Sequence, residues 1–370
     1  MKIVHVSDSH LGFSAYSKSD PELGINQREA DFYSAFAQAI DKAVDLAPDM
    51  IIHSGDLFDK AQPHNRAISF ALRQMIRLSE SGIQTVVVSG NHSTPRLRET
   101  GSIFGIFDHL EGVHPVYEPG IARIATGDLT VHAMPHSTDP PMSAVIKGFK
   151  ASTDTKFNVL AIHAGIHGSD TYRMDDLNEQ AIDMESVPDG LDYVALGHFH
   201  RFSKVRDRAY YSGSTERTGF GEAGQSKGIV EVDLDRNSVR FHELAIRDML
   251  VLDPIDASDL SATEIARDVR SVIETHPIEG KIVRIHINGV RPEVSRSLDM
   301  PGIRRMGADA LVFDPRIGRA EGPCETALHD ASIGALAQEF RKYVEGLNVD
   351  ASRKENLLNR GVSYFSEEDA

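Results

Sequence analysis

Short apolar runs alternate with amphipathic stretches along the first two thirds of the chain. Residues 2–8, 49–56 and 85–92 are short and mainly apolar, which is typical of buried strands. Residues 26–46 carry apolar side chains at helical spacing and predict a helix, and residues 64–81 predict a second one. Strand–helix–strand units of this kind indicate a parallel sheet.

The predicted strands that follow are closer together, with fewer helices between them. They cover residues 157–165, 192–200, 209–214, 228–235 and 238–245. This order suits either a mixed sheet or two sheets packed as a sandwich, flanked by helices. The predicted fold class is therefore α/β (α+β), with a two-sheet sandwich as its main body.

A smaller α/β unit is predicted after a connector at residues 246–254. Its helices are expected at 262–275 and 292–307, and its strands at 281–289 and 310–315. Glycine and charged residues after the last strand indicate that a linker follows this unit.

The C-terminal part is predicted to begin as this linker, at residues 316–331, and to end as helices. Apolar side chains there form one stripe at helical spacing: Ile333, Leu336, Phe340, Val344 and Leu347. The stripe either packs against the body of the chain or docks onto a partner. The chain is thus expected to divide into residues 1–248, 249–320 and 321–370.

The composition adds one constraint on function. Hydrophobic content of 41% and charged content of 25% are ordinary for a globular protein. The formal net charge of −16 argues against a nucleic-acid binder, which usually has a basic balance. Bound divalent metal ions would offset part of this negative charge.

Cysteine content and the N-terminal residues predict a cytoplasmic location. The single cysteine, Cys324, excludes a disulfide framework and fits a reducing compartment. The chain enters a predicted strand at once, without the pattern of a signal peptide. No stretch approaches the ~20 apolar residues that a membrane helix needs.

Five short polar motifs lie at the carboxyl ends of predicted strands. They contain Asp8 and His10, Asp56, Asn91 and His92, His163, and His198 and His200. In an α/β sheet such strand ends converge on the ligand crevice, so five separate pieces of chain are expected to meet there. Glycines before Asp56, Asn91 and His198 allow tight turns and close approach of the backbone.

The residue types in these motifs suit metal ions. Imidazole and carboxylate groups bind Mn, Fe or Zn, and six of them together with the Asn91 amide make seven ligands, which exceed the needs of one ion and suit two. A carboxylate such as Asp56 can bridge the ions, and water between them becomes a hydroxide nucleophile. His92 would then lie beside a substrate phosphate and protonate the leaving oxygen.

Each motif alone is weak evidence for a metal site, because a single Asp-x-His or strand histidine is more often structural. All five in this order are hard to attribute to chance. His5 and His53 lie inside predicted strands and are interpreted as core residues. The sequence leaves open whether four further histidines line the cleft: His64, His132, His136 and His167.

The full set resembles the calcineurin-like metallophosphoesterase superfamily. Four longer strings resemble its SbcD nuclease family, which includes the nuclease subunit of the meiotic-recombination type of repair complex: DSHLG (8–12), GDLFD (55–59), GNH (90–92) and ALGHFH (195–200). Residues 210–234 resemble a further element of that family. The resemblance covers residues 1–245 by motif and the smaller unit by architecture only.

The resemblance implies two Mn²⁺, or other divalent ions, per chain. Asp8, His10 and His200 would hold the first ion, Asn91, His163 and His198 the second, with Asp56 bridging and His92 catalytic. It also implies a DNA nuclease of double-strand-break repair, acting as a 3′→5′ exonuclease on duplex ends and an endonuclease on single strands and hairpins. In a prokaryote such a protein would be nucleoid-associated.

The resemblance further implies an assembly. Residues 249–320 would cap the nuclease domain and help admit DNA, and the C-terminal helices would dock on an SbcC-like ABC-type coiled-coil ATPase. A homodimer is expected, with the helix near 64–80 and the loop after His92 as candidate contacts.

The sequence departs from the family pattern in two places. Ser93 stands where an acidic residue often follows the Asn-His pair, which puts the tuning of His92 in doubt. Asp59 and Lys60 stand where some members have a histidine, so contacts with the substrate phosphate are expected to differ.

Basic residues near the motifs are either DNA contacts or solvated surface charges. They are Arg96, Arg98, Arg201, Lys204, Arg206, Arg208 and Arg217. The alternative to a nuclease is a metallophosphoesterase that acts on a small-molecule phosphodiester or a phosphoprotein, which suits the acidic charge. A non-catalytic scaffold is disfavoured because it would have lost ligands.

Overall fold

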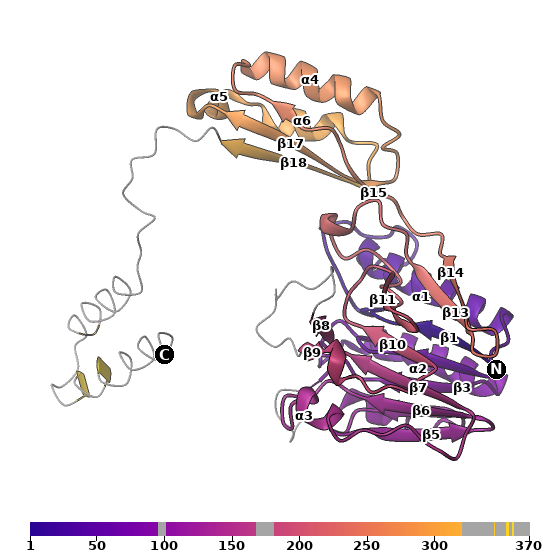
Figure 1. The fold of residues 1–370 in the computed structure, drawn as a ribbon. Helices are drawn as coiled ribbons and strands as arrows, with labels where there is room; N and C mark the ends of the chain where they lie inside the picture. The colour runs from indigo at the N-terminus through magenta and orange to yellow at the C-terminus, as the bar shows by residue number, and fades with distance from the viewer. Residues whose placement is uncertain (95–100, 168–180, 320–343, 345–352, 355–356, 359–370) are drawn as a thin grey trace.

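The computed structural model describes residues 1–94, 101–167, 181–319, 344, 353–354 and 357–358. Two six-stranded sheets form its main body (Figure 1). Alternate side chains of their strands interleave between the sheets, among them Ile3, Ile52, Val131 and Val159, all fully buried. This shared core makes the body a two-sheet sandwich, as the spacing of the strands predicted.

The first sheet contains the early strands and has the order β14-β13-β1-β2-β3-β4. β1 (Lys2–Val6), β2 (Met50–His53), β3 (Gln84–Val88) and β4 (Val113–Val116) run parallel. β13 (Gly228–Asp233) and β14 (Ser238–Glu243) are antiparallel additions at one edge.

The second sheet has the order β11-β12-β10-β7-β6-β5. Its four inner strands are parallel: β12 (Ala209–Tyr211), β10 (Tyr193–Gly197), β7 (Phe157–His163) and β6 (Leu129–Met134). The edge strands β11 (Ser203–Arg206) and β5 (Ala122–Thr126) are antiparallel to their neighbours.

Two long helices cover the outer face of the first sheet. α1 (Gln27–Asp45) begins at Asn26, whose side chain accepts hydrogen bonds from the Arg28 and Glu29 amides. α2 (Asn65–Ser81) ends at Gly82, which has φ 73°. Their apolar faces, including Phe36, Ile40 and Met75, pack against that sheet in one cluster.

Short elements complete the main body. They are the 3-10 helices η2 (Ile103–Phe107), η3 (Met184–Ser186) and η4 (Phe220–Glu222), the helix α3 (Met142–Ile146), and the strands β8 (Gly165–His167) and β9 (Ala181–Asp183). α3 and β9 contribute to a third buried cluster on the outer face of the second sheet.

A third sheet, in residues 249–319, forms what we call the small α/β unit, which lies beyond one end of the sandwich (Figure 1). Three strands flank β17 (Ile282–Val290) in parallel: β15 (Met249–Val251), β16 (Ile255–Asp256) and β18 (Val312–Arg319). Its helices are α4 (Ala262–Glu274), α5 (Pro292–Ser297) and α6 (Met300–Met306). These elements enclose a hydrophobic cluster of their own.

The structure corrects three boundaries predicted for this region. The predicted helix at 292–307 is two short helices, because Pro301 cannot continue a helix from the preceding turn, and Asp299 starts a new one by accepting from the Gly302 amide. The predicted connector at 246–254 contains β15. Residues 316–319 of the predicted linker belong to β18.

The predicted C-terminal helices lie almost entirely outside the described residues. Of the apolar stripe only Val344 is described, and it is helical and buried. No described helix combines the length and the apolar character that crossing a membrane requires.

Candidate metal centre

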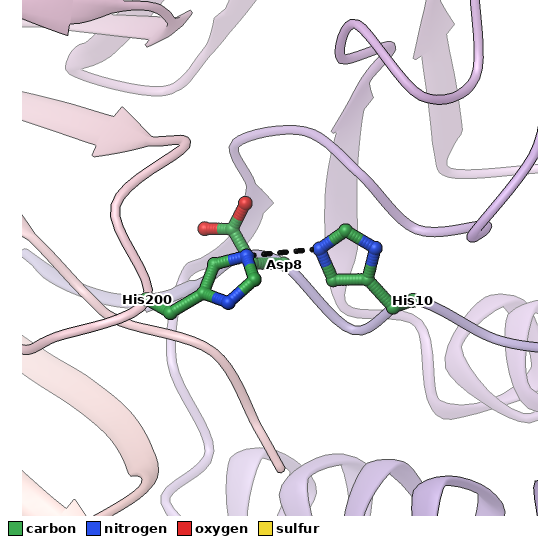
Figure 2. A group of neighbouring side chains, drawn as sticks. All are labelled: Asp8, His10 and His200. Carbon is green, nitrogen blue, oxygen red and sulfur yellow. Dashed lines mark hydrogen bonds between the residues drawn. The ribbon is translucent and has the colours of Figure 1, made fainter. Parts of the chain in front are cut away.

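The loops after β1, β2, β3 and β10, together with the end of β7, bring the predicted ligands to one place. Asp8 and His10 follow β1, Asp56 follows β2, and His163 is the last residue of β7. Figure 2 shows Asp8, His10 and His200 gathered there, with the two histidine rings facing each other. The strand ends therefore converge as the motif positions predicted.

The backbone at this site adopts conformations that L-residues rarely use. Four predicted ligands have positive φ: Asp8 at 51°, His10 at 41°, Asp56 at 50° and His198 at 105°. Such strain persists only where the surrounding structure imposes it, and it gathers at functional sites. Here the positive φ values direct side chains of successive loops toward a common point.

Two glycines permit the close approach of these loops. Gly55 has φ 111°, and a Cβ there would overlap the His163 ring. A Cβ at Gly90 would overlap the Asp56 carboxylate. Any side chain at either position would separate the ligands, which explains the glycines that precede Asp56 and Asn91.

The first cluster consists of Asp8, His10 and His200. One ligand atom from each lies within 4.8 Å of the others, and the two histidine Nε2 atoms are 3.0 Å apart. Nδ1 of His200 lies 2.8 Å from the Glu222 carboxylate and donates to it, so Nε2 of the neutral ring is a lone-pair acceptor. Potential ligand atoms of all three side chains thus meet at one point, with the Nε2 lone pair of His200 directed at His10.

The second cluster consists of Asp56, Asn91 and His163. Nε2 of His163 lies 2.9 Å from Oδ1 of Asn91 and 3.1 Å from Oδ2 of Asp56. Nδ1 of the same ring donates to the Ser54 carbonyl at 3.0 Å, which leaves Nε2 without a proton in the neutral form. The three ligand atoms therefore face one another at distances that either a proton on Nε2 or a bound cation would satisfy.

The carboxylates are held by backbone amides from the neighbouring loops. Both oxygens of Asp8 lie 3.1 Å from the His198 amide, and Oδ1 of Asp56 accepts from the His92 amide at 3.0 Å. The His198 ring lies edge-on to His163, with centroids 5.4 Å apart. All seven predicted ligands are therefore adjacent.

The electrostatics of the site favour a positive charge among the carboxylates. Burial alone would raise the pKa of Asp8 and Asp56, but the neighbouring histidines, His163 first, lower both below their usual range. Burial alone would lower the pKa of His163, but Asp56 and Asp8 raise it to about 9. A proton on His163 satisfies these carboxylates in the metal-free chain, and a divalent cation fits the same donor set.

This arrangement predicts how pH affects the metal-free chain. Because the pKa of folded His163 exceeds the ordinary 6.5, its proton stabilises the fold fully below pH 6.5, and this contribution is lost as pH rises toward about 9. We expect the free energy of unfolding in chelator to fall across this window by up to about 3 kcal/mol. Chemical denaturation at several pH values measures it.

Two controls test whether His163 causes this pH dependence. His163→Gln removes the titrating ring, so the free energy of unfolding should change little with pH. Saturating Mn²⁺ should reverse its sign, because the cation binds the neutral ring. A metal-free wild-type chain whose stability stays constant from pH 6.5 to 9 would contradict the assigned protonation.

His92 lies beside the clusters with its side chain exposed. Its Nδ1 lies 3.1 Å from the Asp59 carbonyl and donates to it, and its ring stands edge-on to His10 with centroids 4.9 Å apart. This leaves Nε2 as the atom that can exchange a proton with a ligand. The hydroxyl of Ser93 is buried and donates to the Phe58 carbonyl, so it does not replace a carboxylate beside His92.

Three residues at the site were missed as contributors by the sequence analysis. Asp59 was treated as a departure, yet its carboxylate lies 3.5 Å from Nδ1 of His10 and groups with His10 and His92. Glu222 and Lys227 lie behind His200, and the Lys227 ammonium donates to the His200 carbonyl at 2.6 Å. The only signal was their position in the strings GDLFD and 210–234.

Four of the other histidines considered in the sequence have structural partners. His5 lies between Ser54 and Tyr193, and His53 contacts Ser9, which agrees with their interpretation as core residues. His64 begins α2, and His132 pairs with Asn158. His136 is buried, and the side chain of His167 lies outside what the structure describes.

The basic residues divide into buried and exposed groups. Arg217 is only 7% exposed, and its guanidinium donates to the Gln225 and Arg247 carbonyls, so it anchors the chain and cannot reach DNA. Arg206 is partly buried against backbone carbonyls. Arg201, Lys204 and Arg208 are exposed, whereas Arg96 and Arg98 lie outside the described residues.

Comparison with known proteins places this site in a family. Residues 1–202 match the family model of the calcineurin-like phosphoesterases. The chain is 26% identical to the DNA double-strand break repair protein Mre11 of Methanococcus maripaludis, over 93% of this chain and 91% of the relative. It is 27% identical to the protein of the same name from Thermoplasma acidophilum, over 95% and 96% of the two chains.

A third relative is more similar over a shorter stretch. The Mre11 protein of Saccharolobus solfataricus is 30% identical over 54% of this chain and 49% of its own. The matched family model spans the motifs that carry the two clusters. The chain therefore belongs to the calcineurin-like phosphoesterase family, and within that family it is of the Mre11/SbcD nuclease type.

Proposed function

We propose that this chain is a Mn²⁺-dependent DNA nuclease of double-strand-break repair. It would act as a 3′→5′ exonuclease on duplex ends and as an endonuclease on single strands and hairpins. The observation that carries the phosphodiester chemistry is the pair of adjacent clusters of carboxylate, imidazole and amide groups with an exposed histidine beside them. The DNA substrate is supported by the names of the relatives aligned over nearly the whole chain.

The proposed roles follow from the contacts. Asp8, His10 and His200 would hold one ion, and Asn91, His163 and His198 the other. Asp56 would bridge the two, since its carboxylate groups with His163 of one set and with Asp8 of the other. When bound, two divalent cations polarise a phosphoryl group and acidify water.

The protein's own groups prepare the site for the reaction. Hydrogen bonds from His163 to the Ser54 carbonyl and from His200 to Glu222 direct both Nε2 atoms inward. Amides of the loops hold the carboxylates in place. His92, with Nδ1 donating to the Asp59 carbonyl, would present a protonated Nε2 to the leaving oxygen.

The rest of the assembly is also proposed. The small α/β unit would act as a cap that helps admit DNA, with the nuclease domain at residues 1–248 and the cap at 249–320. The C-terminal segment from residue 321 would dock on an SbcC-like coiled-coil ATPase, and two chains would pair through their nuclease domains. A cytoplasmic, nucleoid-associated location follows from this role.

The alternative substrate is a small phosphodiester or a phosphoprotein, which the net charge of −16 favours. Labelled hairpin DNA and a small phosphodiester, each incubated with Mn²⁺ and with chelator, separate the two. We expect Mn²⁺-dependent cleavage of the hairpin, lost in chelator and restored by added Mn²⁺. Fast turnover of the small ester with intact DNA would instead support the alternative.

A further inference from the structure

We propose that Glu222 positions His200 for metal binding and that the small α/β unit holds Glu222 in place through Phe220. This deepens the function proposed above and rests on it, because it assigns His200 to a metal ion. It would make the affinity of one metal ion depend on where the small α/β unit sits.

Glu222 forms a hydrogen bond with the ring of His200. Oε1 of Glu222 lies 2.8 Å from Nδ1 of His200, and their side chains are only 14% and 24% exposed. A carboxylate on Nδ1 fixes the tautomer and the plane of the ring, so that Nε2 keeps its lone pair toward Asp8 and His10. Without Glu222 the ring could rotate or carry its proton on Nε2.

A buried lysine forms an ion pair with Glu222. Lys227 has a fully buried side chain, and its ammonium contacts the other carboxylate oxygen of Glu222 at 2.5 Å. The same ammonium donates to the His200 carbonyl at 2.6 Å. Lys227 thus ties the backbone of His200 to the carboxylate that orients its ring, and the geometry of the pair is set at both ends.

The short helix that contains Glu222 also contacts the small α/β unit. Glu222 is the last residue of η4, and Phe220 is the first residue of the same short turn. The Arg284 guanidinium of β17 lies over the Phe220 ring, 3.9 Å from its centroid. Arg284 is itself fixed by Asp314 of β18, with nitrogen–oxygen distances of 2.9 and 2.7 Å.

These contacts form one chain from the small α/β unit to the metal centre. A movement of β17 must either break the stacking of Arg284 on Phe220 or shift the three-residue turn. Because Phe220 and Glu222 are two residues apart, a shift of the turn changes the hydrogen bond to His200. A ligand that moves the small α/β unit would therefore alter the first metal cluster.

The test compares four variants of the full chain: Glu222→Ala, Glu222→Gln, Arg284→Ala and Arg316→Ala. Arg316→Ala is the matched control, because Arg316 also contacts Asp314 at 2.9 Å, whereas the guanidinium over the Phe220 ring is that of Arg284. Calorimetry measures the number and affinity of Mn²⁺ ions. Nitrogen NMR of the metal-free chain reports which ring nitrogen of His200 carries the proton.

We expect two ions in the wild type and a loss of about 10–100-fold in the affinity of one ion in Glu222→Ala. Glu222→Gln keeps an acceptor for Nδ1–H, so it should retain most of that affinity although its thermal stability falls. Arg284→Ala should weaken the same ion by a smaller factor, and Arg316→Ala should leave both ions unchanged.

Three results would each overturn one part of this proposal. A Glu222→Ala chain that binds two ions as the wild type does, with Nδ1 of His200 still protonated, would overturn the positioning role. Equal affinities in Arg284→Ala and Arg316→Ala would overturn the link to the small α/β unit. A wild-type chain that binds no Mn²⁺ would overturn the proposed function itself. If Glu222→Ala does not fold, Glu222→Leu takes its place, with the same expected loss of affinity for one ion and the same result that would overturn the positioning role.

Discussion

Replacing Asp56 with asparagine is expected to lower phosphodiester cleavage by at least ~10³-fold and to reduce the Mn²⁺ bound below two ions per chain. Asp56 is buried, its Oδ2 lies 3.1 Å from Nε2 of His163, and its carboxylate groups both with His163 and with Asp8 of the first cluster. The amide keeps the shape of the carboxylate but places an N–H donor where converging lone pairs must face a cation.

The fold should survive this substitution. The asparagine oxygen can still accept from the His92 amide, and its amide nitrogen can donate to Nε2 of His163. Calorimetry with Mn²⁺ and cleavage of hairpin DNA measure the two effects. Glu231→Gln is a suitable control, because the carboxylate of Glu231, in β13, is partly buried and pairs with Lys2 of β1 and His242 of β14. Retention of two ions and full activity in Asp56→Asn would remove Asp56 as the bridge.

His92→Ala is expected to lower the rate of DNA cleavage by about 10²–10⁴-fold while both metal ions remain bound. The His92 ring is exposed beside the clusters and donates through Nδ1 to the Asp59 carbonyl. The ring groups with His10 and Asp59, but it is not one of the seven residues proposed to hold the two ions. Loss of the ring should therefore affect proton transfer to the leaving group and leave metal affinity intact.

The leaving group provides the sharpest measurement of this role. A nitrophenyl phosphodiester has a leaving group that needs no proton, so His92→Ala should slow its cleavage far less than that of DNA. His109→Ala removes another exposed histidine and serves as the control. Equal losses on both substrates would assign His92 to substrate binding, and loss of bound Mn²⁺ would assign it to the metal centre.

The main elements were predictable from local patterns. α1 and α2 begin and end within one residue of their predicted positions, because apolar spacing and the capping residues Asn26 and Gly82 are local signals. The break at Pro301 was missed because the apolar spacing continues across it. β4, β5 and β6 were not predicted, since their short and partly polar runs gave no clear period.

The sequence by itself determined the set of candidate ligands and their order, because each ligand lies at or just after the end of a recognisable strand. Parallel strands must end at the same edge, so proximity of Asp8, Asp56 and Asn91 followed from topology alone. It also indicated the family, through strings that surround these residues.

Only the tertiary structure decided what surrounds the ligands. In the folded chain Arg217 is a buried anchor, and the Asp59 carboxylate lies beside His10. Glu222 and Lys227 lie behind His200. These contacts join residues that have no common period and lie up to about 50 residues apart, so spacing carries no information about them. They depend on how loops and sheets pack, which is a property of the folded chain.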